Sequence, residues 1–350
     1  MAPASDAVRV VRAAAIRRQP EALQRLERAG FTSGHAMHVT ASKSAGRLTV
    51  NFHPDRIAQS GLTVAAGLAK TGRYLSQWRT GISSGSRSAV PGGDRQRWEH
   101  ELFGDAYADA NPEVTDFPIY GAWDLHRDPH GGSPRFGSCF LVLRDRVRER
   151  TTMCLGDSHA GPVDMGTFDA PWCVIAGMAE RAREGDVLGT PGNAATLRQL
   201  LEGPVAAQAP RRDLDNYVET QVHGGIDLRC DVAIAVLDPS FRGTHVHEAL
   251  EALASSSDMA IEWHAGSELA VDEVPDDFRG PIMPELAKSV ARLDGKVDAH
   301  AIGEAARSVA SSEIKPGGDD PASDAQQLKY LWHTLLRFGS DAAGSLGRRD

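Results

Sequence analysis

The sequence predicts a soluble α+β enzyme, and three observations lead to that fold class. Strand patterns come in clusters rather than in strict alternation with helices, which favours α+β over a doubly wound parallel sheet. The chain has 350 residues, 41% of them hydrophobic and 24% charged, so it can bury a substantial core at ordinary globular composition. Short polar phrases containing glycine stand at the ends of strand patterns, where binding and catalytic residues tend to lie on a rigid scaffold.

The chain begins with a predicted helical extension that covers residues 1–46. Apolar and charged residues alternate at helical spacing over residues 7–29, and Pro20 predicts a break between two helices. This region has no uninterrupted apolar segment, and no stretch of the chain is apolar enough for long enough to span a bilayer. We therefore expect a cytoplasmic protein that does not bind a membrane.

Residues 47–339 are expected to form a single α+β catalytic domain, followed by a frayed tail at 340–350. The predicted strands cover residues 47–53, 120–125, 136–143, 151–155, 218–228, 232–237 and 259–263. The predicted helices cover residues 64–71, 171–202 with a loop at 189–192, 246–254, 284–293 and 325–338. The remaining segments include 74–85, strand-like and then turn-rich, and the predicted loops 87–97 and 315–324.

Charge and cysteine usage narrow the class of protein. The formal net charge of -9 argues against a protein that holds nucleic acid by charge alone, because neutralising phosphates requires a surplus of Lys and Arg. The cysteines show no CxxC spacing and lie in or beside apolar runs, which predicts buried free thiols in a reducing compartment. These residues are Cys139, Cys154, Cys173 and Cys230.

The polar phrases follow one another in an order that resembles a known family. They read NFHPDR, YLSQWRTGISSG, GGDRQRWEHELFG, SPRFGSC, YVETQVHGGIDL, DPSF, DFRGP and LKYLWH. Over roughly residues 48–339 this series resembles a bacterial family catalogued only as domain of unknown function number 3626. That resemblance supplies no activity, so the function has to be argued from the residues.

Three of these phrases are also similar in order to the motifs of the ADP-ribosyltransferase superfamily, whose members hold NAD in the cleft of a split, mostly antiparallel sheet. The resemblance implies such a sheet here, covered by helices from both ends of the chain, and NAD as cosubstrate. On the first strand it implies His53 and Arg56 as residues that hold NAD. On the second it implies Tyr74, Ser83 or Ser84 as support for the nicotinamide end.

The resemblance implies Glu219 as the catalytic carboxylate, with Gln221 and His223 orienting the acceptor. Cleavage of a glycosidic bond develops oxocarbenium character, and a fixed carboxylate stabilises that positive charge. The sequence departs from the superfamily pattern at Tyr217, where Gln or Glu is usual, and Gln221 stands two residues after the glutamate instead. The acceptor stays open between a protein side chain, a nucleic acid, a small molecule and water, and a toxin-like activity is one such case.

Arginines beside Pro or Gly suit bidentate recognition of a pyrophosphate, and Arg56 and Arg135 are the candidates for a cofactor contact. Pairing of these side chains with buried carboxylates is the structural alternative. For Arg56 the two interpretations are equally supported.

Other functional classes remain open. The phrase Gly156-Asp157-Ser158-His159 after a predicted strand resembles the first block of SGNH/GDSL ester hydrolases, in which Ser158 would be the nucleophile, although the later blocks of that family are poorly matched. A turn that uses Gly and Asp is the structural alternative. His245 and His247 could join other His or Asp side chains around a metal, but no established ligand spacing supports this and none is predicted. A non-catalytic interaction protein is the last alternative.

Overall fold

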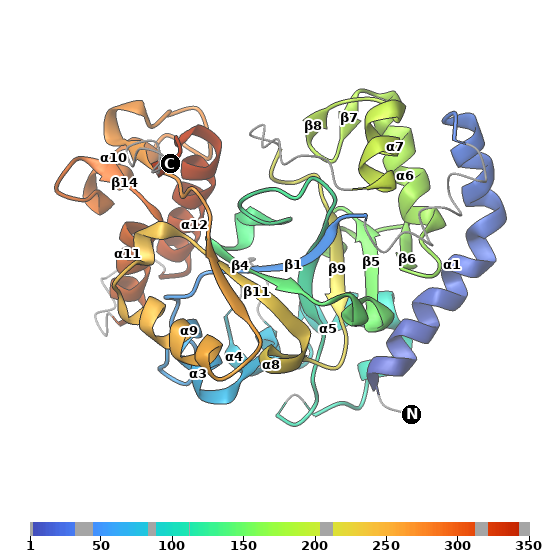
Figure 1. Cartoon of the computed structure of the whole chain (residues 1–350), viewed down its shortest axis with the longest axis horizontal. Helices are drawn as coiled ribbons and strands as arrows, with labels where there is room; N and C mark the ends of the chain where they lie inside the picture. The colour runs from blue at the N-terminus through green and yellow to red at the C-terminus, as the bar shows by residue number, and fades with distance from the viewer. Residues whose placement is uncertain are drawn as a thin grey trace.

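The computed structural model describes residues 3–31, 45–82, 89–111, 113–203, 213–311 and 321–342. A large sheet crosses the middle of the molecule, with helices α6, α7 and α1 at one end and α10, α11 and α12 at the other (Figure 1). The predicted α+β class is confirmed in this form. Ser83 and Ser84 lie outside the described residues.

The central sheet has eight strands in the order β12-β11-β4-β1-β3-β9-β5-β6. Every neighbouring pair is antiparallel except β11 and β12, which are parallel, so the sheet is mostly antiparallel as expected. The strands are β1 (Arg47–Phe52), β3 (Ile119–Asp124), β4 (Cys139–Leu143), β5 (Thr151–Leu155), β6 (Met165–Thr167), β9 (Val218–Val222), β11 (Val232–Leu237) and β12 (Ala260–Trp263).

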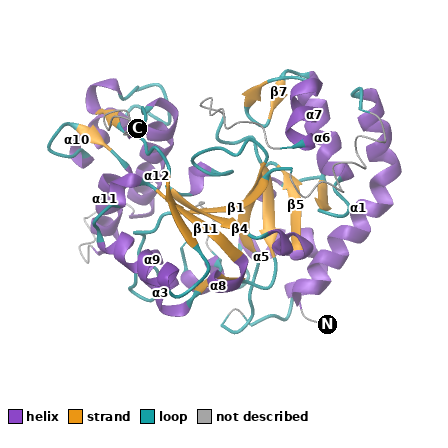
Figure 2. Cartoon of the chain, viewed as in Figure 1, coloured by secondary structure: helices purple, strands orange, loops and turns teal. Residues whose placement is uncertain are grey.

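The sheet forks between β1 and β3. These two strands pair only over Arg47–Thr49, opposite Ala122–Asp124, whereas β1 stays paired with β4 up to Phe52 and β3 stays paired with β9 down to Ile119. Figure 2 shows β1, β4 and β11 running away from β5 on the other arm. Gly137 packs so tightly on β1 that a Cβ there would lie 2.0 Å from the backbone of Phe52, which explains the glycine.

Smaller elements surround the sheet. Three two-stranded ribbons pair β2 (Arg73–Tyr74) with β10 (Ile226–Asp227), β7 (Asp186–Val187) with β8 (Thr190–Pro191), and β13 (Leu269–Ala270) with β14 (Lys296–Val297). The helices are α1 (Pro3–Arg28), α3 (Val64–Thr71), α4 (Gln77–Thr80), α5 (Asp94–Phe103), α6 (Trp172–Arg183), α7 (Ala194–Glu202), α8 (Leu228–Asp231), α9 (His245–Ser255), α10 (Met283–Val290), α11 (Ala299–Ser311) and α12 (Pro321–Phe338).

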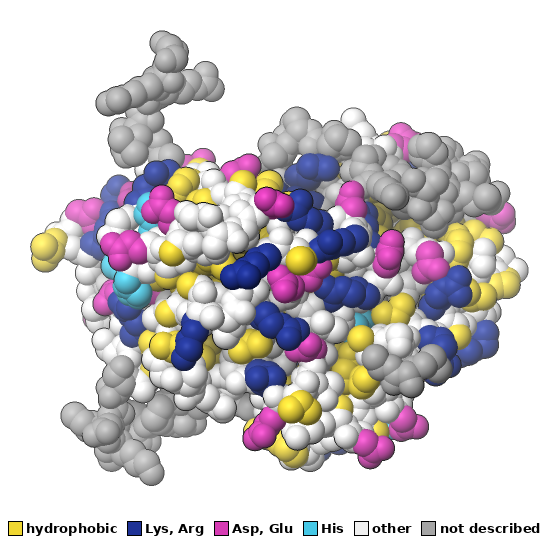
Figure 3. All heavy atoms as spheres, turned by 60° about the horizontal axis from the view of Figure 1, so that its bottom comes forward, with side chains coloured by type: hydrophobic (Ala, Val, Ile, Leu, Met, Phe, Trp, Pro, Cys, Tyr) yellow, Lys and Arg dark blue, Asp and Glu magenta, His cyan; other side chains and the backbone are white. Residues whose placement is uncertain are grey.

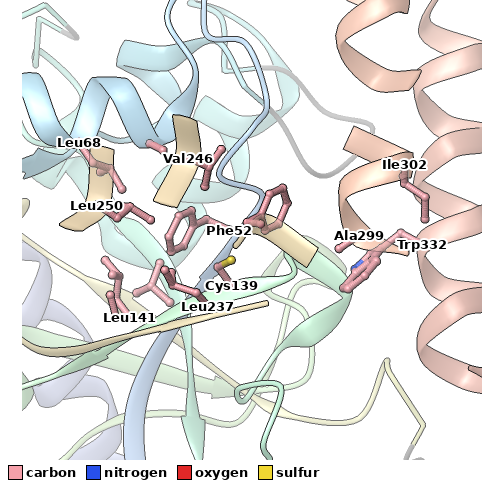
Figure 4. Packing of buried hydrophobic residues seen from close by; sticks show 14 of the residues in the cluster. Phe52, Leu68, Cys139, Leu141, Leu237, Val246, Leu250, Ala299, Ile302 and Trp332 are labelled. Carbon is pink, nitrogen blue, oxygen red and sulfur yellow. The ribbon is translucent and has the colours of Figure 1, made fainter. Parts of the chain in front are cut away.

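Alternate residues of β1 divide the sheet into an apolar and a polar face. Leu48, Val50 and Phe52 belong to the largest hydrophobic core, whereas Thr49 and Asn51 point to the other side. Figure 4 shows how Phe52 meets residues from β4, β11, α3 and α9 in this core, labelled Leu68, Cys139, Leu141, Leu237, Val246 and Leu250. A functional site on the polar face is therefore backed by a packed core.

The predicted break at Pro20 is wrong, because α1 is one helix that contains Pro20. Its buried residues keep helical spacing across the proline, and Pro20 itself is exposed. Packing of that stripe against α6 and β6 holds the helix together although the proline lacks an N–H for the preceding turn. The buried residues are Ala7, Val11, Ala15, Ala22 and Leu26.

Several predicted boundaries also differ from the structure. The predicted loop 87–97 overlaps α5, which begins at Asp94, and the predicted loop 315–324 overlaps α12, which begins at Pro321. The segment 74–85 contains little strand, since β2 ends at Tyr74 and α4 follows. Helix α11 was not predicted.

Three further expectations concern the cysteines, the C-terminal tail and membrane spanning. Cys230 is exposed on α8, while the other three cysteines are buried as expected. Most of the predicted frayed tail lies outside the described residues, and at its start Ser340 pairs with Glu268 in an isolated β-bridge. None of the helices within the described segments combines the length and apolarity needed to cross a membrane.

Candidate active site

Two adjoining cavities open where β1 and β3 separate, the first on the polar face and the second around the end of β1. The first, of about 190 Å³, is lined by Tyr120 and Glu219 among others. The second, of about 150 Å³, extends from the end of β1 toward α3 and α4 and is lined by His53. Tyr74 and Phe136 line both cavities, so these aromatic side chains stand at their boundary. A single elongated ligand could therefore contact both.

Glu219 reaches the first cavity from β9, which pairs with β3 on the side away from the fork. On β9 the side chains of Glu219 and Gln221 share one face, because alternate residues of a strand point the same way. The Glu219 carboxylate accepts hydrogen bonds from Gln221 Nε2 at 2.9 Å, from the Tyr217 hydroxyl at 3.2 Å and from the Ser158 backbone N–H at 3.4 Å. The side chain is thus held by neutral donors.

Glu219 is buried without a cationic partner. Glu219 is only 4% exposed, and it makes no ion pair with any other described residue. Burial, together with the negative charge of Asp157, raises the pKa of Glu219 to about 7. A carboxylate kept in this way is neither a surface charge nor a buried salt bridge, and perturbed acids of this kind are concentrated at functional sites.

The second cavity is cationic. Its lining includes Arg56, Arg73 and Arg79 together with His53, and no Asp or Glu from the described residues. Arg73 is paired with Asp116 at 2.7 Å, whereas Arg56 and Arg79 make no ion pair with any described residue. Burial, reinforced by the positive charge of Arg56, lowers the pKa of His53 well below its usual value, so this imidazole is neutral. The cavity is suited to an anionic group.

Arg135 lines the first cavity but its guanidinium is already engaged. Nη2 donates to Asp157 and Nη1 donates to Asp215. Its predicted contact with a cofactor phosphate would have to replace these bonds, so the structure favours the structural alternative for this residue. Lys329 on α12 also lines the cavity, and burial lowers the pKa of this lysine to about 8.

The phrase Gly156-Asp157-Ser158-His159 forms the turn and short 3₁₀ helix Ser158–Ala160 after β5. Asp157 accepts a hydrogen bond from the His159 backbone as the helix cap, and its carboxylate lies 2.6 Å from His159 Nδ1. Ser158 lies against Glu219 instead of a histidine. The turn chemistry accounts for Gly156 and Asp157, while Ser158 and His159 still line the first cavity.

The other predicted site residues fall into two groups. His53, Arg56 and Tyr74 line the cavities, and their contact with a ligand stays a prediction. Gln221 and His223 are 0% exposed and line neither cavity, so they cannot touch an acceptor, contrary to the expectation. They lie behind Glu219 because the polar face of β9 continues beneath neighbouring elements.

The metal alternative gains nothing from the geometry. In the part of the chain that is described, no three His, Cys, Asp or Glu side chains are placed to hold a metal ion. His247 packs its ring against Trp263, with ring centroids 4.9 Å apart, and His245 lies 3.2 Å from Arg307.

Some residues of the site stand in the polar phrases of the sequence but were not singled out there as site residues. Asn51 anchors the loop over β1 by donating to the carbonyls of His130 at 2.7 Å and Gly137 at 3.1 Å, and it lines both cavities. Lys329 comes from the opposite end of the chain. Tyr217 was visible only as a departure from a family pattern, yet its hydroxyl supports Glu219 directly.

Comparison with known proteins identifies relatives without a known activity. The family described as "Protein of unknown function (DUF3626)" matches residues 47–338, which confirms the resemblance seen in the sequence. The Gene 2 protein of Mycobacterium phage L5 is 26% identical over 169 residues, which are 45% of this chain and 56% of the phage protein. The Gene 2 protein of Mycobacterium phage D29 is 25% identical over 170 residues, 46% of this chain and 56% of the phage protein. The chain thus spans little more than half the length of these relatives.

Proposed function

This chain belongs to the DUF3626 family, and from that starting point we propose that it is an NAD-dependent ADP-ribosyltransferase, or an NAD glycohydrolase when water is the acceptor. One observation carries the proposal. Glu219 is a buried carboxylate without a cationic partner among the described residues, and it is aimed into a cavity that adjoins a second cavity. In that second cavity Arg56 and Arg79 make no ion pair with a described residue, although the charge of Asp55 acts on Arg56, and the described lining has no Asp or Glu. The pair of environments matches a ligand with an anionic end and an end that becomes positive during reaction.

The division of NAD between the cavities follows from charge. The pyrophosphate would lie in the second cavity, where Arg56 and Arg79 can each donate charge-assisted hydrogen bonds to phosphate oxygens. Tyr74 and Phe136 at the boundary offer aromatic faces to a flat ring. The ribose that carries nicotinamide would then lie in the first cavity beside Glu219.

In the reaction the bond between C1′ of this ribose and the nicotinamide nitrogen breaks, and nicotinamide leaves with the bonding electrons. The ribose becomes oxocarbenium-like, and the buried, ionised Glu219 stabilises that charge at short range. The acceptor then forms a bond to C1′, and its proton passes to solvent or to His159, which lines the same cavity. Neutral donors leave the Glu219 charge uncompensated until the sugar becomes positive.

A serine ester hydrolase is a second candidate because Ser158 lies in the same cavity. Its hydroxyl, however, is beside Glu219, and the contact of Asp157 with Nδ1 of His159 would orient a general base without bringing it to Ser158. No histidine among the described residues bonds the Ser158 hydroxyl, which is the contact an activated serine needs. We keep this activity as one outcome of the test below.

The decisive experiment is incubation of the protein with NAD and detection of released nicotinamide. Glu219→Gln is expected to lower the release rate by about 100-fold or more, the scale for losing an electrostatic stabiliser. Glu262→Gln, the same change on an exposed strand residue of β12, should retain the wild-type rate. Ser158→Ala should lose less than about tenfold, since the backbone N–H toward Glu219 remains.

The alternatives have distinct results. Turnover of a p-nitrophenyl ester that disappears with Ser158→Ala and survives Glu219→Gln would identify the hydrolase. Wild-type protein that neither binds NAD nor releases nicotinamide, with protein, nucleic-acid and small-molecule acceptors present, would refute the transferase.

A further inference from the structure

A row of buried polar side chains lies directly behind Glu219. The Tyr107 hydroxyl lies 2.8 Å from His223 Nδ1, and His223 Nε2 lies 3.0 Å from Thr152 Oγ1. Thr152 Oγ1 donates to Gln221 Oε1 at 2.7 Å, and Gln221 Nε2 donates to Glu219 Oε1 at 2.9 Å. Four hydrogen bonds thus connect the 3₁₀ turn after α5 to the carboxylate in the first cavity.

Counting hydrogens gives this row a single direction. Thr152 has one hydroxyl hydrogen, which it donates to Gln221, so it must accept from His223 Nε2. Burial lowers the pKa of His223 to about 3, and a neutral imidazole with its hydrogen on Nε2 has Nδ1 free to accept from Tyr107. Every donor therefore points toward Glu219.

Ligand contact does not explain the row. Thr152, Gln221 and His223 are 0% exposed and line neither cavity. Three apolar residues would fill the same strand positions without any need for hydrogen-bond partners. A directed row that ends on a buried carboxylate without a cationic partner has a further use, because it fixes which end of the Gln221 amide faces Glu219.

We propose that Thr152, His223 and Tyr107 are positioning residues, which act through Gln221 to hold its N–H toward Glu219 and so keep the carboxylate aimed into the first cavity. The use that we infer for this row rests on the proposed function, but the hydrogen bonds that form the row do not. Gln221 is itself a positioning residue, since it touches Glu219 and not the ligand space.

Loss of the Thr152 hydroxyl would release the amide. Gln221 Oε1 would lose its donor, and His223 Nε2–H would lose its acceptor, so a His223 tautomer with its hydrogen on Nδ1, which can accept at Nε2 from the N–H of a turned amide, becomes competitive. Glu219 would then face an amide oxygen. The other ionisable groups against it are Asp157 from the turn after β5, Cys154 from β5, Tyr217 from β9 and Tyr120 from β3, and none of these is a cation.

The test is the Glu219 pKa, measured by ¹³C NMR of glutamate carboxyl carbons in the full chain, with the Glu219→Gln spectrum as assignment. Thr152→Val keeps the shape and removes the hydroxyl, and it should raise the Glu219 pKa by about one or more, as expected for losing a donor to a charged group. It should also lower kcat for nicotinamide release about tenfold with little change in KM for NAD. Thr152→Ser restores the hydroxyl and should restore both values.

Thr220→Val is the matched control. Thr220 is on β9 between Glu219 and Gln221, is 1% exposed, and makes no side-chain hydrogen bond with another described residue. The same isosteric change there should leave the Glu219 pKa and kcat unchanged. If Thr152→Val gives the same values as Thr220→Val, the positioning role is overturned.

Two further results separate the inference from the proposed function. A raised Glu219 pKa in Thr152→Val, in a protein that never turns over NAD, would support the positioning role while the transferase assignment fails. If Thr152→Val does not fold, Tyr107→Phe takes its place, because an imidazole without its Nδ1 donor can change tautomer and draw the Thr152 hydrogen away from Gln221. An unchanged Glu219 pKa in Tyr107→Phe would then overturn the inference.

Discussion

The surroundings of Glu219 allow its carboxyl group to be either protonated or ionised. Its donors are an amide, a phenol and a backbone N–H, none of which carries a formal positive charge. Ionisation therefore costs free energy in the absence of ligand, and the pKa of about 7 expresses that cost. A positive sugar ring nearby would recover it.

The first prediction concerns pH. Because only ionised Glu219 can stabilise a cation, the rate of nicotinamide release should rise with pH and level off above about 7. The measurement is kcat/KM for NAD between pH 5 and pH 9. A rate that is flat from pH 5 upward would contradict the role of this carboxylate.

The same ionisation affects stability, with a sign that can be checked. The folded-state pKa of Glu219 lies above its unfolded value, so the folded state holds the extra proton, and stability is lost as pH rises from about 4.5 through about 7. Glu219→Gln lacks this loss. The free energy of unfolding of Glu219→Gln relative to wild type should thus increase from pH 5 to pH 8, by roughly 1.4 kcal/mol for each pH unit that separates the folded and unfolded pKa values.

For single residues, the sequence analysis singled out side chains that stand in the polar phrases. It missed side chains whose role depends on what the fold brings next to them. Glu219, His53, Arg56 and Tyr74 stand in recognisable polar phrases, and all of them line the cavities. Gln221 was assigned to the wrong side of Glu219, because a two-residue spacing gives the face of a strand but not what covers it. Tyr107 and Thr152 are distant in sequence, and only the folded sheet brings them to His223.

Among the elements, α1 illustrates how packing overrides local preference. The helix continues through Pro20 because its buried stripe stays in phase on both sides of the proline. Pro20 removes one backbone hydrogen bond at an exposed position, and nothing in its own contacts compensates.

Replacing this proline should therefore stabilise the protein. Pro20→Ala is expected to raise the free energy of unfolding by about 1–3 kcal/mol, measured by denaturant titration. Pro20→Gly should gain about 1 kcal/mol less, because it restores the N–H but favours the helix poorly. A Pro20→Ala protein less stable than wild type would contradict this expectation.

The predicted elements were most accurate where a run of residues had one pattern. The predicted strands 151–155 and 232–237 coincide with β5 and β11, which carry continuous apolar or β-branched residues. Helix α5 was missed in part because its charged residues Asp94, Arg95 and Arg97 look like a loop after two glycines. Its buried side is partly polar, with Glu99 accepting hydrogen bonds from Trp78 at 3.0 Å and Tyr120 at 2.8 Å.

For the whole molecule, local charge differs from net charge. The chain carries a formal charge of -9, yet the second cavity is lined by arginines, and basic side chains also gather near the middle of the face in Figure 3. An anionic ligand must cross a weakly repulsive outer field and is then held by a short-range cationic environment.

The arginine variants test that environment. Arg56→Ala and Arg79→Ala should each raise KM for NAD about tenfold, the scale of one charge-assisted hydrogen bond, with a smaller effect on kcat. Arg183→Ala, at an exposed position on α6, serves as the control. Values of KM for Arg56→Ala and Arg79→Ala equal to that of Arg183→Ala would place the anion elsewhere.

The fork between β1 and β3 has a consequence for selectivity by length. Arg56 and Arg79 follow β1 in the chain, and Glu219 lies on β9 on the other side of the fork, while β1 and β3 pair only at Arg47–Thr49. A molecule confined to the second cavity meets Arg56 and Arg79, and one confined to the first cavity meets Glu219 beside Arg135 and Lys329. The pairing between β1 and β3 thus sets the distance between the two binding regions. A two-part ligand of the matching length binds tightly, and either of its halves alone binds weakly.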